Sequence, residues 1–397
     1  MSKKTKSRRV AAHRQPENRA VANGATPRPE GINGSGDHGG PELPEASPRA
    51  DDALQGKLRS MEAAPTPAQP AAARAADPKP AAAERAAARP TTARPTAARP
   101  AKPAASRAGR GHPPVVIHQI FFDGKQRPHL ESPFTPFDNG GSRDPLLEFG
   151  VFEKLYAGLG KNPPPLWGAV SWRFREKTGL TGSDFLQAIA ERPGCDLYLC
   201  SPNPELEAIY SNLWMQGAPS HPRLLEVAAA FLQVNGIGED CLYEIQPSVV
   251  FSNANYFVGG PGFWDQYVPF VRRLIDTARK SLPRPMLKLI NSSEGDPRKL
   301  HAEATYWPFI IERLLPVFLK QHGQGLRVAR IPPINESRLN SHLRRLREMK
   351  DVAHHTKSKW LASCWLHYRN TYVMNIASRD WCQTNLPLIT PKSLEFY

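Results

Sequence analysis

Asn253, Asn255 and Tyr256 are small polar and phenolic side chains that lie just before a glycine-rich turn. Amide and phenol groups both donate and accept hydrogen bonds, so they can hold the polar groups of a ligand. The glycines at positions 259, 260 and 262 let the backbone approach a ligand closely, and Pro261 suits the first turn of a helix. This stretch therefore indicates the floor of a binding site. The alternative is that the amides only satisfy hydrogen bonds of a local turn.

Two carboxylates are candidates for a general base. Asp196 lies in the short apolar run 195–200, and Glu312 lies within an apolar helical pattern over residues 304–320. A charged side chain is costly in a protein core unless it has a partner. Glu312 and the adjacent Arg313 are therefore either a structural ion pair or groups kept for catalysis and ligand binding. Asp196 is either structural or a second candidate base.

Four further candidates for ligand binding lie within or just after predicted strands: His118, Trp172, Arg173 and Asn203. A histidine can act as a base, bind a ligand or hydrogen-bond a backbone carbonyl. Trp172 can stack on a sugar or nucleobase, although an aromatic residue in a strand is also a core residue. Arg173, with the cations at positions 175 and 177, can hold an anionic group through charge-assisted hydrogen bonds.

These residues need a sheet to position them. Apolar runs predict strands at 115–122, 166–174, 195–200 and 249–251, and periodic apolar residues predict helices at 145–157, 183–192, 205–214, 221–232, 263–278 and 304–320. Residues 122–145 are rich in Pro, Gly, Asp and Asn and predict a loop. Gly168, inside a predicted strand, indicates a close backbone approach. The alternation predicts an α/β fold with a mostly parallel sheet flanked by helices, which binds ligands at the carboxyl ends of its strands.

Composition divides the chain near Gly111. Residues 1–112 consist largely of Ala, Pro, Arg and Gly and carry 20 basic against 10 acidic side chains, so we expect a long disordered basic tail. Residues 113–325 should form the α/β domain, and residues 326–397 a mainly helical extension packed on it. The tail is either a solvated linker or an arm for anionic surfaces, and nucleic acid is an unlikely partner because no aromatic residue is interleaved with the arginines.

The sequence also bears on location. No stretch is long and apolar enough to predict a membrane span. The five cysteines form no CxxC metal pair, which favours a reducing cytoplasm. The basic stretch 338–359 predicts a solvated helical face or, as the alternative, peripheral contact with an anionic membrane.

Four motifs occur in an order that resembles uncharacterised bacterial glycosyltransferase-like proteins of surface-polysaccharide and lipopolysaccharide gene clusters. The motifs are Ile117–Ile120, Trp167–Phe174, Asn255–Val258 with Phe263–Asp265, and Phe309–Leu315. The first is similar to the opening strand of nucleotide-sugar transferases with the Rossmann-like GT-A fold. The resemblance covers about residues 115–322.

The resemblance implies a glycosyltransferase that moves a sugar from a nucleoside diphosphate sugar to a polysaccharide or lipid-linked acceptor. It implies that Asn253, Asn255 and Tyr256 orient sugar hydroxyls. Glu312 or Asp196 would be the base. The Asp-x-Asp that commonly holds Mn²⁺ or Mg²⁺ in such enzymes is absent, since Tyr198 stands where a second carboxylate would be. No metal ligand is therefore predicted, and a non-catalytic carbohydrate- or nucleotide-binding protein is the alternative.

Overall fold

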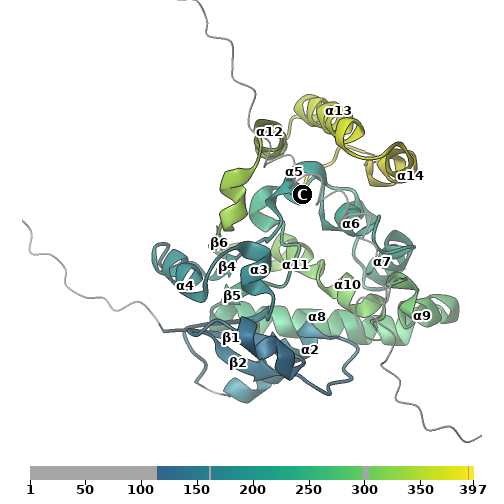
Figure 1. The fold of residues 1–397 in the computed structure, drawn as a ribbon. Coiled ribbons are helices and arrows are strands. Elements are labelled where there is room, and N and C mark those ends of the chain that lie inside the picture. The colour runs from purple at the N-terminus through teal and green to yellow at the C-terminus, as the bar shows by residue number, and fades with distance from the viewer. Residues whose placement is uncertain (1–113, 161, 298–303, 392) are drawn as a thin grey trace, which may run out of the picture. The chain divides into compact units, whose positions relative to one another are not determined.

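The computed structural model of the protein describes residues 114–160, 162–297, 304–391 and 393–397. The predicted tail, residues 1–112, lies outside the described residues. Within these ranges the chain forms a six-stranded sheet with helices on both faces, in the strand order β2-β1-β3-β5-β4-β6 (Figure 1). The α/β class expected from the alternation of strands and helices is confirmed.

The sheet is mixed, with one antiparallel strand among parallel ones, so the predicted mostly parallel sheet is confirmed only in part. Its strands are β1 (Val115–Phe121), β2 (Thr135–Asp138), β3 (Leu166–Ser171), β4 (Leu197–Leu199), β5 (Phe257–Gly259) and β6 (Val328–Arg330). β1 is parallel to β2 and β3, and β4 is parallel to β6. β5 lies between β3 and β4 and runs antiparallel to both. β6, from the predicted C-terminal extension, completes the sheet at one edge.

Helices cover both faces of the sheet. The α-helices of the predicted α/β domain are α2 (Glu148–Leu159), α3 (Phe174–Thr178), α4 (Gly182–Ala190), α5 (Pro204–Ile209), α6 (Leu213–Gly217), α7 (Leu224–Val234), α8 (Pro261–Ser281), α9 (Arg284–Ile290), α10 (Tyr306–Ile311) and α11 (Leu314–His322). The loops of this domain contain four short 3-10 helices: η1 (Gly124–His129), η2 (Glu239–Leu242), η3 (Ser248–Val250) and η4 (Ser293–Gly295).

The C-terminal region is mainly helical, as predicted. It contains η5 (Ile334–Arg338), α12 (Ser341–Thr356), α13 (Lys359–Ile376) and α14 (Arg379–Ile389). The helices α12, α13 and α14 follow one another side by side (Figure 1). Their buried residues share an apolar core with α5 and α6. This core ties the C-terminal helices to the segment that follows β4.

The sheet has an apolar core on each face. Ile120, Trp167 and Phe257 face the core made with α2, α8 and α11, whereas Ile117 and Val170 face the core made with α4. A strand that is buried on both sides needs apolar residues at successive positions, which explains the near-continuous apolar runs. Burying each such large side chain contributes about 1.5–3 kcal/mol.

Gly168 confirms the close approach that its position in a strand indicated. It pairs with Val258 across β3 and β5. A Cβ atom at residue 168 would lie 3.0 Å from the Cα atom of Val258, and closer still to the carbonyl oxygen of Phe257. Only glycine allows the two strands to come this near to each other.

The predicted strand at 249–251 is wrong. Val249 and Val250 belong to the 3-10 helix η3, and Phe251 directly follows it. Val249 is 41% exposed, so the run is not buried on both sides as a central strand would be. The strand is instead β5, whose three residues are all buried and which follows Asn253 and Asn255. Because β5 is antiparallel, its amino end lies beside the carboxyl ends of β3 and β4. The two amides therefore still lie at the sheet edge where a site was expected.

Other boundaries also differ from the prediction. The strand at 166–174 ends at Ser171, and α3 begins at Phe174. The loop 122–145 contains η1 and the edge strand β2, and the helix at 205–214 is divided into α5 and α6. The helix at 304–320 breaks at Glu312 and Arg313. Pro316 has no amide hydrogen to donate to the carbonyl of Glu312, so one continuous helix is disfavoured there.

Candidate functional site

Most of the predicted ligand-binding residues gather at the carboxyl edge of the parallel strands. Trp172 and Arg173 follow β3, and Asn203 follows β4. Asn253 and Asn255 precede the antiparallel strand β5, which brings them to the same edge. We call this region, from the end of β1 to the end of β6, the polar edge. It is the part of an α/β sheet where ligands usually bind.

Tyr256 links two parts of the polar edge. Its hydroxyl lies 2.5 Å from the hydroxyl of Ser171, the last residue of β3. Burial raises the pKa of the Tyr256 phenol, so it stays neutral. Next to it, Asn255 Nδ2 donates to Glu148 Oε2 at 3.0 Å. These contacts bring the first turn of α2, with a half-buried carboxylate, to the polar edge.

A cavity of about 520 Å³ opens at the polar edge beside Trp172. The rings of Trp172 and His129 have their centroids 5.5 Å apart. The guanidinium carbon of Arg173 lies 5.9 Å from the Trp172 ring centroid. Arg175 also lines the cavity, and its Nη1 lies 3.9 Å from Glu131 Oε1. Aromatic rings next to cations suit a ligand that carries both a flat ring and phosphate groups.

Arg173 itself is exposed and forms an ion pair with Glu176 one turn along the chain. Its Nε donates to Glu176 Oε2 at 2.8 Å. Exposed ion pairs of this kind contribute little to stability, typically about 0–1 kcal/mol. Exchanging Glu176 for a ligand phosphate as the partner of Arg173 would therefore change the stability of the fold little.

His118 does not belong to the polar edge. It lies in the middle of β1, paired with Thr135 and Ala169, and three more strand residues follow it, or about 10 Å. Both ring nitrogens are buried without a hydrogen-bond partner in the described chain. Burial lowers the pKa of His118, so its ring is neutral. His118 thus lies within its strand, and its predicted contact with a ligand stays a prediction.

Asp196 lies at the opposite edge of the sheet. It directly precedes β4, whose three residues separate it from the polar edge by roughly 10 Å. Its Oδ2 accepts a hydrogen bond from the backbone nitrogen of Arg327 at 2.8 Å and lies 3.8 Å from Arg327 Nε. The structure thus places Asp196 away from the polar edge and gives it Arg327 as a partner.

Glu312 and Arg313 lie at the junction of α10 and α11. Arg313 is buried, and its guanidinium donates to the carbonyl oxygens of Leu213 at 2.8 Å and Phe309 at 2.6 Å. Its Nη1 lies 3.4 Å from Glu312 Oε2. These contacts tie α6 to the α10–α11 junction. Arg313 therefore has a structural role here, which is one of the two alternatives left open by the sequence, and its predicted contact with a ligand stays a prediction.

The sequence reasoning missed a buried group of charges beside the polar edge. Glu207 on α5 is fully buried, and Arg330 Nη2 lies 2.9 Å from each of its carboxylate oxygens. Arg330 and Arg347 both pair with Glu336 of η5. Burial raises the pKa of Glu207 to about 7 against the influence of the two arginines. Glu148 was also missed, since an acidic residue in the first turn of a helix has no distinctive sequence signal.

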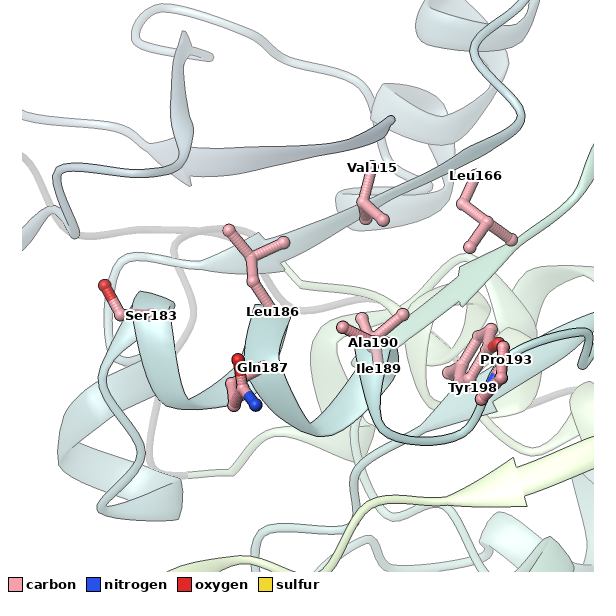
Figure 2. Close-up of a pocket in the computed structure, with 9 residues that line it drawn as sticks. All are labelled: Val115, Leu166, Ser183, Leu186, Gln187, Ile189, Ala190, Pro193 and Tyr198. Atoms are coloured by element: carbon pink, nitrogen blue, oxygen red, sulfur yellow. The ribbon is translucent and has the colours of Figure 1, made fainter. Parts of the chain in front are cut away.

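A second cavity, of about 430 Å³, is apolar and holds none of the predicted ligand-binding residues. Figure 2 shows Leu186 and Ala190 of α4 lying opposite Val115 and Leu166, the first residues of β1 and β3. Tyr198 also lines it, but its hydroxyl donates to the Arg192 carbonyl at 2.7 Å. This cavity lies near the amino ends of the strands, away from the polar edge.

Comparison of the chain with protein-family models, with curated proteins and with solved structures gave no match. Across the described ranges, no group of three or more His, Cys, Asp or Glu side chains is arranged to hold a metal ion. None of the helices in the described part of the chain is both long and apolar enough to cross a membrane.

Proposed function

We propose that this protein is a nucleotide-sugar glycosyltransferase of the GT-A-like type. It would move a sugar from a nucleoside diphosphate to a polysaccharide or lipid-linked acceptor in bacterial surface-polysaccharide synthesis. The observation that carries the proposal is the cavity of about 520 Å³ at the polar edge, which is lined by Trp172, His129 and Arg175. Arg173 does not line it but lies beside the Trp172 ring. The size of the cavity lies within the usual range of small-ligand sites.

Each part of the donor has a matching group in this proposal. The nucleobase stacks on Trp172, and the diphosphate takes charge-assisted hydrogen bonds from Arg173 and Arg175. The sugar lies toward β5, where Asn253 and Asn255 present amides. From β1 to β4 the polar edge spans three strand spacings, or about 14 Å, so one extended ligand can reach from the cavity to the amides.

Glu148 is our first candidate for the general base. Asn255 holds its carboxylate at the polar edge beside Tyr256, where an acceptor hydroxyl would approach the sugar. Asp196 lies at the other edge of the sheet. Glu312, whose side chain is 29% exposed and paired with Arg313, is retained as the second candidate. In the proposed reaction the base takes the proton of the acceptor hydroxyl, and the cations stabilise the leaving diphosphate.

The experiment is a binding and turnover screen on the full chain. The protein is incubated with a panel of nucleotide sugars, with and without Mn²⁺, and nucleotide release and thermal shift are recorded. Trp172→Ala should weaken binding of the donor by about 5- to 150-fold, because base stacking on an aromatic ring contributes about 1–3 kcal/mol. Trp360→Ala is the matched control, since Trp360 is 75% exposed on α13. Failure of every nucleotide and nucleotide sugar to bind would refute the proposal.

The alternative function is a non-catalytic protein that binds carbohydrate or nucleotide at the same polar edge. It is favoured by one observation, namely that both carboxylates predicted from the sequence have partners away from the cavity: Asp196 with Arg327, and Glu312 with Arg313. Binding of a nucleotide sugar without nucleotide release, in wild type and in Glu148→Gln alike, would favour this alternative.

We also propose that the exposed Arg344 and Arg345 of α12 contact an anionic membrane.

A further inference from the structure

Two asparagine side chains at the polar edge each have one side-chain amide atom without a hydrogen-bond partner among the described residues. Asn253 Oδ1 accepts a hydrogen bond from the Ser201 hydroxyl at 3.0 Å, and Asn335 Nδ2 donates to the Pro202 carbonyl at 3.1 Å. The remaining atoms, Asn253 Nδ2 and Asn335 Oδ1, are buried and find no hydrogen-bond partner among the described residues. Both amides are thus fixed at one end to consecutive residues of the turn after β4.

The orientation of Asn335 is set by chemistry. A backbone carbonyl only accepts, so the amide nitrogen of Asn335 must face Pro202 and its oxygen must be the free atom. A serine hydroxyl can donate or accept a hydrogen bond, so the Asn253 amide can face Ser201 with either its oxygen or its nitrogen. In both orientations the other atom of the Asn253 amide has no hydrogen-bond partner among the described residues. A buried polar atom without a partner raises the free energy of the fold, so a partner supplied by a ligand would be favourable.

Asn335 belongs to the C-terminal region, on the short helix η5. Ile334, the first residue of η5, packs against Gly179 at the end of α3. Asn335 contacts the turn after β4, and Glu336 is held by Arg330 at 2.6 Å and Arg347 at 2.9 Å. η5 therefore links the end of α3 to the turn after β4 and is anchored by ion pairs.

We propose that Asn253 and Asn335 together bind the glycosyl group of the ligand and select it by its hydroxyl groups. This inference rests on the proposed function, because it places the sugar of the donor at the turn after β4. The free oxygen of Asn335 requires a hydrogen-bond donor, which a sugar hydroxyl provides and a fully ionised phosphate does not. A sugar hydroxyl can donate to the amide oxygen or accept from the amide nitrogen, so it can bond the free atom of Asn253 in either orientation of the amide.

The test compares a nucleotide sugar with its own nucleoside diphosphate. Binding of both to the full chain is measured by calorimetry for wild type, Asn253→Ala and Asn335→Ala. Each variant should bind the nucleotide sugar about 3- to 10-fold more weakly and the nucleoside diphosphate unchanged, since one neutral hydrogen bond is lost in each case. Asn335→Ser replaces Asn335→Ala if the alanine variant does not fold.

Asn370→Ala is the matched control. Asn370 on α13 also has a buried Oδ1 without a partner in the described part of the chain, but α13 packs chiefly on α12, α14 and α5. This variant should bind both ligands as wild type does. Equal weakening of nucleotide sugar and nucleoside diphosphate by Asn335→Ala, or no weakening of either, would overturn the inference while leaving the proposed function intact.

A separate arm keeps the inference testable if wild type binds no nucleotide, which would refute the proposed function. Free monosaccharides are then added to ¹⁵N-labelled protein, and the side-chain amide signals of Asn253 and Asn335 are followed, each assigned by its alanine variant. Shifts confined to these two amides, and absent with inorganic phosphate, would support a sugar-binding pair. No shift with any monosaccharide would overturn it.

Discussion

Replacing Arg313 by methionine should destabilise the fold without removing a ligand contact. Arg313 is 2% exposed, and its guanidinium donates to the carbonyls of Leu213 and Phe309 and to Gln216 Oε1. Methionine fills much of the same space but donates no hydrogen bond, and Glu312 loses its cation. Hydrogen bonds from a charged donor contribute about 1.5–3 kcal/mol each, so losing those of the buried guanidinium should cost about 3–5 kcal/mol, a large share of the stability of a typical domain.

Chemical denaturation followed by circular dichroism measures this loss, and a thermal melt should show a decrease of roughly 10 °C. Arg345→Met on α12 is the control, because Arg345 is exposed and its replacement should change stability by less than about 0.5 kcal/mol. The same reasoning predicts a loss for Gly217→Ala, whose Cβ would lie 2.6 Å from Arg313 Cζ and 2.7 Å from Nε.

The two substitutions should not be additive, because the methionine side chain no longer presents a rigid guanidinium to the methyl group introduced on α6. Combining Gly217→Ala with Arg313→Met should therefore cost less than the sum of the single losses. The reasoning is refuted if Arg313→Met unfolds at the same denaturant concentration as wild type and yet weakens nucleotide-sugar binding. In that case Arg313 would be the ligand contact that the sequence predicted.

Three more predictions concern single residues. The pKa of His118 is lowered from 6.5 in the fold, so the unfolded chain takes up a proton first and stability falls as the pH drops below about 6.5; His118→Phe should flatten this fall in denaturant titrations at several pH values. Gly168→Ala should cost at least about 1–3 kcal/mol in the same titrations at neutral pH, because its Cβ meets the backbone of β5. Asp196→Asn should retain transfer within about twofold, whereas Glu148→Gln should lower it about 10²-fold or more in a nucleotide-release assay, and the reverse result would return the base to Asp196.

The sequence alone determined the features that depend on neighbouring residues. The near-continuous apolar run at 115–122 predicted β1, and the periodic apolar residues of 183–192 predicted α4. In the structure α4 starts at a capping box formed by Thr181 and Asp184. Pro261 was expected at the first turn of α8 and is found there. Gly168 indicated a close approach of two strands. Each of these signals is read from residues within one strand or one helical turn.

The tertiary structure decided the direction of β5 and the composition of the polar edge. Strand direction follows from pairing with β3 and β4, so no local pattern could show that Asn253 and Asn255 precede their strand and still reach the carboxyl edge. Asn255 meets Glu148 across 107 residues, and Arg330 meets Glu207 across 123. The residues next to a charged side chain in the sequence do not show whether it is buried against such a distant partner or exposed to solvent. Only the folded chain shows that Asp196 has Arg327 as its partner, because Arg327 comes from the distant segment that leads into β6.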